Sequence, residues 1–137
     1  MKACFGRRYM MSSSHRLHSD ALSSEQNRTV YGKCNNPYGH GHNYILEVLA
    51  GGEVDSETGM VVNLVHIDEV VQTRILDRFD HANLNLDPLF TDNVPTTENL
   101  CKAVYKLLEG SLEPAHLMHV RIEETENNFF EYGGEAS

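Results

Sequence analysis

A short block of the chain, residues 32–44, restricts the possible fold and chemistry more than any other part of the sequence. It places Cys34 shortly before His40 and His42, and Gly41 separates the two histidines. Successive side chains of a β-strand point to opposite faces, so both imidazoles would share one face of a strand. Two neutral imidazoles side by side provide half of a zinc site. We therefore expect a metal-binding strand here rather than a His-rich polar turn.

A third nitrogen ligand is expected from the upstream segment that contains His15 and His18. Spacing alone does not choose between these two histidines, and either one taken singly also fits a surface loop. A site with three protein nitrogens leaves the fourth position of a zinc ion open, which is typical of catalytic rather than structural zinc. Because no fourth protein ligand is apparent in the sequence, we expect a catalytic metal site.

Length and composition predict one globular domain that spans residues 1–137, with 40% apolar residues. No apolar run approaches the length that spans a membrane, and the N-terminal segment does not resemble a signal peptide. We therefore expect no membrane partner and a cytoplasmic location. The three cysteines are odd in number and widely spaced, which favours free thiols over a disulfide framework.

The formal net charge of −9 argues against nucleic acid as a general partner. An anionic substrate would then need a local cationic pocket, because the overall field repels it. Arg16, Arg28 and Lys33 flank the two His-bearing segments and could form such a pocket. Each of them taken singly is more typical of solvated surface.

The hydrophobic pattern predicts four strands and two helices. Strands are expected over residues 2–11, 43–54, 117–125 and 129–132. Helices are expected over residues 65–79 and from Thr96, the expected N-cap, to Gly110. The polar stretches 20–33 and 80–95 are expected to be loops. This order predicts an α+β fold with a mainly antiparallel sheet that is covered on one face by helices.

Three further groups could carry chemistry. Glu124 shares a strand face with apolar neighbours, where a carboxylate needs a partner. It could form an ion pair with a local Arg or reach solvent at the strand end; a receptor for a planar N–H fork is equally consistent. The adjacent residues Asp80 and His81 could transfer protons, although such a pair also arises by chance. A Cys34 thiol beside a metal and a histidine could act as a base or nucleophile, or could be a small buried apolar residue.

Several motifs occur in an order that closely resembles the 6-pyruvoyltetrahydropterin synthase family. The matching segments extend over nearly the whole chain and comprise residues 14–19, 32–44, 58–61, 80–84, 96–99 and 124–128. The resemblance implies the tunnelling fold (T-fold), in which four-stranded antiparallel sheets, each with two helices on one face, are joined into a barrel by oligomerisation. It also implies a homohexamer that consists of two stacked trimers, with active sites between subunits.

The resemblance implies roles for individual residues when it is carried over by position. The residues that would hold zinc are His15, His40 and His42. His18 is then no longer a ligand, and Cys34 would be the catalytic base. Asp80 and His81 would be its relay or the proton donor from a neighbouring subunit. The residues that would bind the pterin are Glu124, as the anchor of the ring, and Thr96 and Thr97.

The resemblance also implies a substrate, 7,8-dihydroneopterin triphosphate, and a carbon–oxygen lyase reaction. The product would be 6-pyruvoyl-tetrahydropterin, formed with elimination of triphosphate in tetrahydrobiopterin-type biosynthesis. Magnesium would accompany the triphosphate, and the sequence shows no dedicated site for it.

Two other functions remain open. The sister enzyme 6-carboxytetrahydropterin synthase, of the queuosine pathway, uses the same substrate and metal, but its cysteine is closer to the His-Gly-His pair. Five residues separate Cys34 from His40 here, which favours the pyruvoyl synthase. A zinc-dependent pterin-binding module without turnover is the other alternative, although binding alone would not require Cys34, Asp80 and His81.

Overall fold

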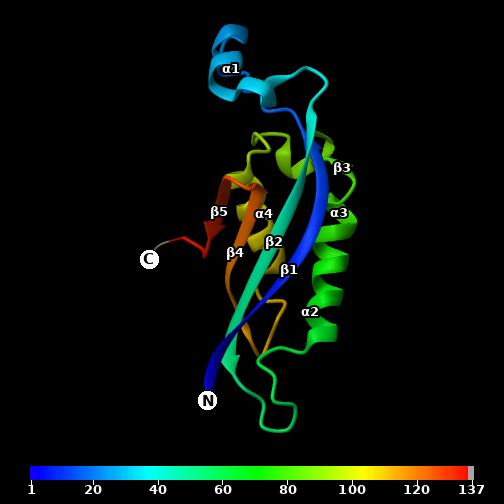
Figure 1. Ribbon diagram of the computed structural model, residues 1–137, viewed down its shortest axis with the longest axis vertical. Helices are drawn as coiled ribbons and strands as arrows, with labels where there is room; N and C mark the ends of the chain where they lie inside the picture. The colour runs from blue at the N-terminus through cyan, green and yellow to red at the C-terminus, as the bar shows by residue number, and fades with distance from the viewer. Residues whose placement is uncertain (136–137) are drawn as a thin grey trace.

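Two long strands, β1 (Lys2–His15) and β2 (His40–Glu53), form the centre of the sheet in the computed structural model, which describes residues 1–135. They pair antiparallel along their whole lengths, so that His15 lies opposite His40 at one end. β4 (His116–Thr125) pairs with β2, and β5 (Asn128–Tyr132) pairs with β4, both antiparallel (Figure 1). The predicted antiparallel sheet is confirmed.

A fifth strand, β3 (Ala82–Asn83), lies beyond β1 and gives the strand order β3-β1-β2-β4-β5. It runs parallel to β1, with Ala82 opposite Ser13. This strand was not predicted, because two residues are too few to show the alternation by which strands are identified. The pairing of β3 with β1 holds the segment after Phe79 at the edge of the sheet.

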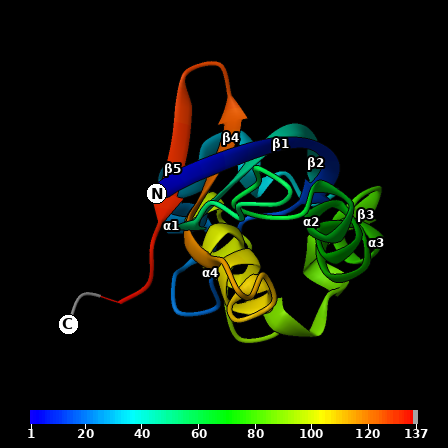
Figure 2. The ribbon, with the colours of Figure 1, turned by 90° about the horizontal axis from the view of Figure 1, so that it is seen from below.

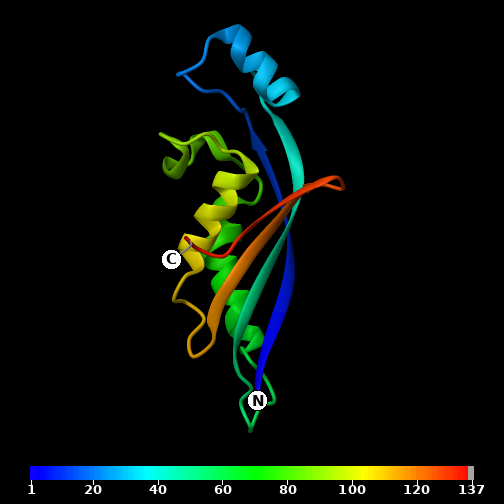
Figure 3. The ribbon, with the colours of Figure 1, turned by 90° about the vertical axis from the view of Figure 1, so that its left-hand side faces the viewer.

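The helices cover one face of the sheet (Figures 2 and 3). α2 (Leu64–Val71), a single π-helical turn η2 (Gln72–Leu76) and α3 (Asp77–Phe79) follow one another without a break, as the helical period predicted. α4 (Thr97–Leu108) begins after the predicted N-cap, Thr96, whose side chain accepts a hydrogen bond from the backbone N–H of Asn99. No helix within residues 1–135 is long and apolar enough to cross a membrane.

The core lies between the helices and the inner face of the sheet. Its fully buried apolar side chains include Tyr44, Leu46, Val48, Ile67, Val71, Ile75, Phe79, Leu100, Val104, Leu108, Val120 and Ile122. Each such side chain contributes roughly 1.5–3 kcal/mol through its removal from water. These side chains come from β2, β4 and the long helices, so the sheet and the helical layer share one core.

The prediction that residues 20–33 form an irregular loop is wrong, because this stretch contains helix α1 (Ser24–Tyr31) and a 3-10 turn, η1 (Gly32–Asn35). A capping box starts the helix: the Ser23 hydroxyl accepts from the N–H of Gln26, and the Gln26 side chain accepts from the N–H of Ser23. The polar composition hid this signal. Figure 1 shows α1 beyond the end of β1 and β2, away from the helices of the core.

The stretch from residue 80 to residue 95 is mostly a loop, as predicted. Besides β3 it contains two short 3-10 turns, η3 (Leu84–Leu86) and η4 (Pro88–Phe90). Asp87 precedes η4 and accepts a hydrogen bond from the backbone N–H of Leu89. Its carboxylate also joins Arg78 through two hydrogen bonds of 2.7 and 2.8 Å, which connect the loop to α3.

Candidate functional site

Three histidines meet where β1 ends and β2 begins. The strand pairing sets His15 directly opposite His40, and His42 lies two residues further along β2 on the same face. The ring centroids are 5.2 Å apart for His15 and His40, 4.9 Å for His15 and His42, and 4.5 Å for His40 and His42. His15, rather than His18, therefore joins the pair. The side chain of His18 instead contacts Asn35 and Asp20.

Cys34 reaches the same place from the 3-10 turn η1. Its Sγ lies 3.1 Å from Nε2 of His40, and its carbonyl accepts a hydrogen bond from the N–H of Leu17, which holds the turn beside the end of β1. One ligand atom from each of His15, Cys34, His40 and His42 lies within 4.8 Å of all the others. The sequence showed no candidate for a fourth protein ligand, whereas the structure places a thiol beside the three imidazoles.

The histidines present metal-binding nitrogens to this cluster. Nδ1 of His15 lies 3.0 Å from the carbonyl oxygen of Pro95, which can only accept, so Nδ1 carries the proton and Nε2 has a free lone pair. Nε2 of His15 and Nε2 of His42 are both buried without a hydrogen-bond partner. Buried nitrogens without partners are costly unless something binds them. Three imidazoles and a thiol are the ligand types that zinc prefers, so the residues present fit a zinc ion.

Burial controls the protonation of the cluster. It lowers the pKa of His15 and of His42, and the negative charge of Glu124 opposes this effect at His42. Both imidazoles are thus favoured in the neutral form that binds metals. Burial, with a further contribution from Glu124, raises the pKa of the Cys34 thiol. Without a cation beside it, this sulfur therefore stays protonated at neutral pH.

Glu124, near the end of β4, lies next to the histidine cluster. Its Oε1 is 3.5 Å from Nε2 of His42, and its Oε2 accepts a hydrogen bond from the hydroxyl of Thr97. Only 13% of the Glu124 side chain is exposed, and no Arg or Lys within residues 1–135 forms an ion pair with it. An ion pair with a local Arg is therefore not formed. The carboxylate faces the site with acceptor capacity left for a ligand's N–H groups.

The two threonines at the start of α4 have different surroundings. The hydroxyl of Thr97 is directed to Glu124, whereas the hydroxyl oxygen of Thr96 accepts from the N–H of Asn99 and caps the helix. Thr97 is buried with only 5% exposure. Thr97 thus lies in contact with the predicted pterin anchor. Thr96 precedes it in the chain, and the hydroxyl of Thr96 is occupied by its hydrogen bond to the helix backbone.

Asp80 and His81 lie apart from the cluster, at the β3 edge of the sheet. Oδ1 of Asp80 accepts from the N–H of Ser12 at 2.8 Å, and the N–H of His81 donates to the carbonyl of Ser12 at 2.6 Å. His81 adopts the left-handed region, with φ of 57°, and its side chain is 83% exposed. No hydrogen bond or ion pair within the described part of the chain joins either residue to Cys34.

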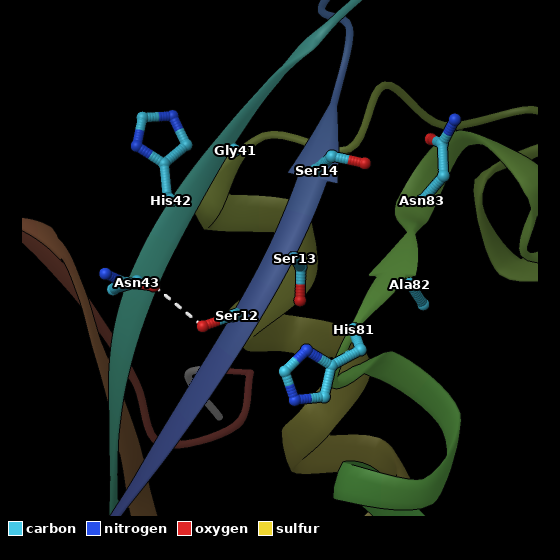
Figure 4. A pocket seen from close by; sticks show the side chains of 9 residues that line it. All are labelled: Ser12, Ser13, Ser14, Gly41, His42, Asn43, His81, Ala82 and Asn83. Carbon is cyan, nitrogen blue, oxygen red and sulfur yellow. Dashed lines mark hydrogen bonds between the residues drawn. The ribbon is translucent and has the colours of Figure 1, made fainter.

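A pocket of about 360 Å³ opens beside His81. Figure 4 shows His81 on the β3 side of β1, whereas His42 lies on β2 with its ring turned away from β1. Ser12 on β1 donates a hydrogen bond to Asn43 on β2 between them. Within one chain, the predicted catalytic residues are therefore divided between two places: Cys34 stands in the histidine cluster, and Asp80 and His81 stand at the exposed edge.

Two groups around His15 were missed by reasoning from the sequence. The Tyr44 hydroxyl lies 3.3 Å from Nδ1 of His15, and the Pro95 carbonyl fixes which nitrogen is protonated. Tyr44 shares the strand face of His40 and His42, so the alternation of β2 would have placed it at the site. The carbonyl of Pro95 has no signal in the sequence, because any residue provides one.

Comparisons with known proteins agree with this arrangement. The family model of 6-pyruvoyl tetrahydropterin synthase matches residues 6–135. The 6-pyruvoyl tetrahydrobiopterin synthase of Homo sapiens is 44% identical over 135 residues, 98% of this chain and 93% of that protein. The Dictyostelium discoideum protein of the same name is 47% identical over 130 residues, 94% of each chain.

Among solved structures, the 6-pyruvoyl tetrahydropterin synthase of Caenorhabditis elegans superposes with a TM-score of 0.92 at 39% identity, over 98% of this chain and 97% of that one. The likeness therefore covers the sheet, both long helices and the strand ends that carry the histidine cluster. Taken with the family match and the two sequence relatives, it leads to one conclusion. The chain belongs to the 6-pyruvoyl tetrahydropterin synthase family.

Proposed function

We propose that this protein converts 7,8-dihydroneopterin triphosphate to 6-pyruvoyl-tetrahydropterin with elimination of triphosphate, as a zinc-dependent lyase. Membership of the family supports the reaction class. The observation that carries the proposal is the placement of Cys34 and Glu124 on either side of one cluster of three imidazoles. This placement supports the assignment of a base, a metal site and a carboxylate anchor to one site.

His15, His40 and His42 would hold the zinc ion. Bound there, zinc would act as a Lewis acid that polarises the side-chain hydroxyls of the substrate and acidifies the neighbouring C–H bonds. The contact of His15 with the Pro95 carbonyl orients its ring so that Nε2 is the ligand atom. The lowered pKa of His15 and His42 keeps both rings unprotonated and ready to bind.

Glu124 would anchor the pterin ring. A carboxylate accepts two parallel hydrogen bonds from adjacent N–H groups, which a pterin ring presents along one edge. The Thr97 hydroxyl holds Oε2 in place, and the low exposure of Glu124 strengthens hydrogen bonds to it by excluding water. The substrate's side chain would then lie over the histidine cluster, since His42 touches the anchor.

Cys34 would be the base that removes a proton from a carbon of the substrate side chain. Its Sγ lies at the cluster, next to Nε2 of His40, within reach of a side chain held there. The first proton passes to sulfur, and the electron pair of that C–H bond shifts into the ring, where the C=N bond is reduced as its nitrogen takes up a proton. Loss of a second side-chain carbon proton then forms a carbon–carbon double bond as the carbon–oxygen bond to triphosphate breaks. Triphosphate leaves with the electron pair of that carbon–oxygen bond, and the enols that result become the two carbonyl groups. This internal redox shift needs no external reductant.

Asp80 and His81 would complete the site from a neighbouring copy of the chain, returning protons during the redox shift. His81 lies exposed and Asp80 half-buried at the β3 edge, and no hydrogen bond or ion pair within residues 1–135 joins either of them to Cys34. In a hexamer whose sheets join edge to edge into a barrel, the exposed sheet edges would be covered. Asp80 and His81 of one chain would then lie at the histidine cluster of a neighbouring chain.

Magnesium would accompany the triphosphate. The free thiols Cys4, Cys34 and Cys101 support a reducing, cytoplasmic location.

Mass spectrometry of the products tests the proposal most simply. Zinc-loaded protein is incubated with dihydroneopterin triphosphate and magnesium, and unstable product is trapped by reduction. We expect a pyruvoyl-tetrahydropterin and free triphosphate. A carboxy-tetrahydropterin with acetaldehyde would instead assign the chain to the queuosine-type reaction. Retained substrate with no product, in fully metal-loaded protein, would make it a pterin-binding module.

A further inference from the structure

A second cavity, which the proposed chemistry does not use, is lined by His40 but by neither His15 nor His42. It has a volume of about 490 Å³, within the range of about 300–1,000 Å³ that is usual for ligand sites. We call it the basic pocket. Its charged and titratable lining residues are Arg16, His18, Arg28, Lys33 and His40. No carboxylate among residues 1–135 lines it, although the chain has 20 acidic residues against 11 basic ones.

The cations of the basic pocket are available to a ligand. Arg28 and Lys33 form no ion pair within the described residues, in contrast to Arg7, Arg78 and Arg121, each of which contacts a carboxylate. Nε of Arg16 donates to a backbone carbonyl, that of Asn35, at 3.3 Å. Positive charge without a protein counter-ion in a concave site raises the local concentration of anions.

Buried polar side chains hold the segments that form the pocket. Nδ2 of Asn35 donates to the carbonyl of Leu17 at 2.7 Å, which joins η1 to the segment after β1. Asn27 is fully buried and donates to the carbonyls of Ser19 and Ser23, so α1 is attached to the loop before it. Hydrogen bonds therefore fix the backbone segments that carry the lining residues of the pocket.

The position of the basic pocket relative to the predicted anchor determines what it can bind. His40 lines the pocket and also belongs to the histidine cluster, where its ring lies 4.5 Å from that of His42. His42 in turn contacts Glu124. Successive contacts therefore run from the carboxylate anchor through the metal ligands to the basic pocket. A ligand with a planar ring at one end and several phosphates at the other would match this order along its length.

We propose that the basic pocket binds the phosphate chain of the substrate, with Arg28 and Lys33 as the residues that recognise a polyphosphate ester rather than the free alcohol. This inference rests on the proposed function for the identity of the ring. The inference adds a specificity site to the proposed active site. The histidine cluster and Glu124 would bind an unphosphorylated pterin without help from Arg28 and Lys33. Side-chain charges at hydrogen-bonding distance of phosphate oxygens supply this preference.

Calorimetric titration of the zinc-loaded protein tests the inference, with magnesium-saturated inorganic triphosphate as the probe so that zinc is not removed. The test variant is Arg28→Gln/Lys33→Gln. The control is Arg74→Gln/Lys106→Gln, which removes the same two charges from exposed positions on the helical layer. We expect the affinity for triphosphate to fall roughly 10- to 100-fold in the test variant and to stay unchanged in the control.

Titration with dihydroneopterin and with its triphosphate separates recognition from folding, and Cys34→Ala is added to every protein in this series to prevent turnover. The test variant should bind dihydroneopterin as its Cys34→Ala parent does, and lose the preference for the triphosphate ester. The binding measurements do not depend on which product the unchanged protein forms, so a different product would overturn the proposed function and leave this inference standing. Equal triphosphate affinity in the test variant and the unchanged protein, or no binding of triphosphate by either, would overturn it.

Discussion

Glu124 and His42 face each other at the site, with Oε1 of the carboxylate 3.5 Å from Nε2 of the imidazole. Nε2 of His42 is one of the buried nitrogens without a hydrogen-bond partner. The predicted ring anchor therefore lies against a predicted metal ligand, and the Thr97 hydroxyl holds the other carboxylate oxygen. A substrate bound through Glu124 would have its side chain fixed relative to the metal before any bond is broken.

The variant Glu124→Gln tests the anchor. An amide offers one acceptor group and one donor group, so it cannot accept two parallel N–H bonds. We expect zinc content to stay unchanged and the affinity for dihydroneopterin to fall roughly 10-fold or more, as measured by fluorescence titration. The neighbouring variant Glu123→Gln is the control, because that carboxylate pairs with Arg121. Undiminished pterin affinity in zinc-loaded Glu124→Gln would remove the anchor role.

Mixing two inactive variants tests whether each site draws residues from two chains. Cys34→Ala and His81→Ala are each expected to be inactive alone. Unfolding and refolding them together in equal amounts would give hybrids in which about one quarter of the sites combine an intact Cys34 with an intact His81 from a neighbour. Turnover near that fraction of the unchanged protein is expected.

The control for this experiment is Cys34→Ala refolded with the double variant Cys34→Ala/His81→Ala, in which no site can be complete. It should stay inactive. If the hybrids of the two single variants also stay inactive while forming the same oligomer, Asp80 and His81 do not act on a neighbouring chain's Cys34.

Thr96→Ala separates a structural from a substrate-binding role for the threonine before α4. Its hydroxyl oxygen accepts from the N–H of Asn99, and loss of an N-cap costs about 1 kcal/mol of unfolding free energy. Urea denaturation at fixed protein concentration should show this loss, with little change in pterin affinity. Thr97→Val removes the hydroxyl that bonds to Glu124. This variant should lower the affinity for the pterin and change the unfolding free energy little. Unchanged stability with weakened pterin binding in Thr96→Ala would instead support the predicted pterin contact.

Stability at acid pH should depend on Asp87. Its hydrogen bonds to Arg78 hold the pKa of the carboxyl below its ordinary value. Above the unfolded-state pKa of about 3.9, the charged Asp87 contributes its full stabilisation. This stabilisation is lost as the pH falls through the lower folded-state pKa, because the unfolded chain binds more protons in that range. Asp87→Asn keeps an acceptor for the N–H of Leu89 and removes the charge. It should be less stable at pH 7, with the difference shrinking towards pH 2 in urea titrations; an unchanged difference would contradict this.

Much of the fold follows from local patterns in the sequence. The alternation along β2 placed Tyr44, Leu46 and Val48 in the core, and the spacing of apolar residues gave both long helices. The same alternation put His40 and His42 on one face. α1 was missed because its residues are polar, although the capping box of Ser23 and Gln26 was present in the sequence.

The remaining parts of the site depend on contacts between distant segments. The choice of His15 over His18 follows from the register of β1 against β2, which opposes His15 to His40. No local pattern encodes that register. The approach of Cys34 to the cluster depends on the turn η1, whose carbonyl bonds to Leu17. The separation of Asp80 and His81 from Cys34 depends on the pairing of β3 with β1, through two residues only.

Cys34 lies close enough to the three imidazoles to be either a base beside the metal or its fourth ligand. Zinc content and product formation, measured on the same preparation of Cys34→Ala, distinguish the two most directly, with His42→Ala as the reference. We predict that Cys34→Ala keeps zinc equimolar with the chain and forms no product, whereas His42→Ala loses both. Loss of zinc from Cys34→Ala to the same extent as from His42→Ala, or full turnover in its zinc-loaded form, would contradict the assignment of Cys34 as the base.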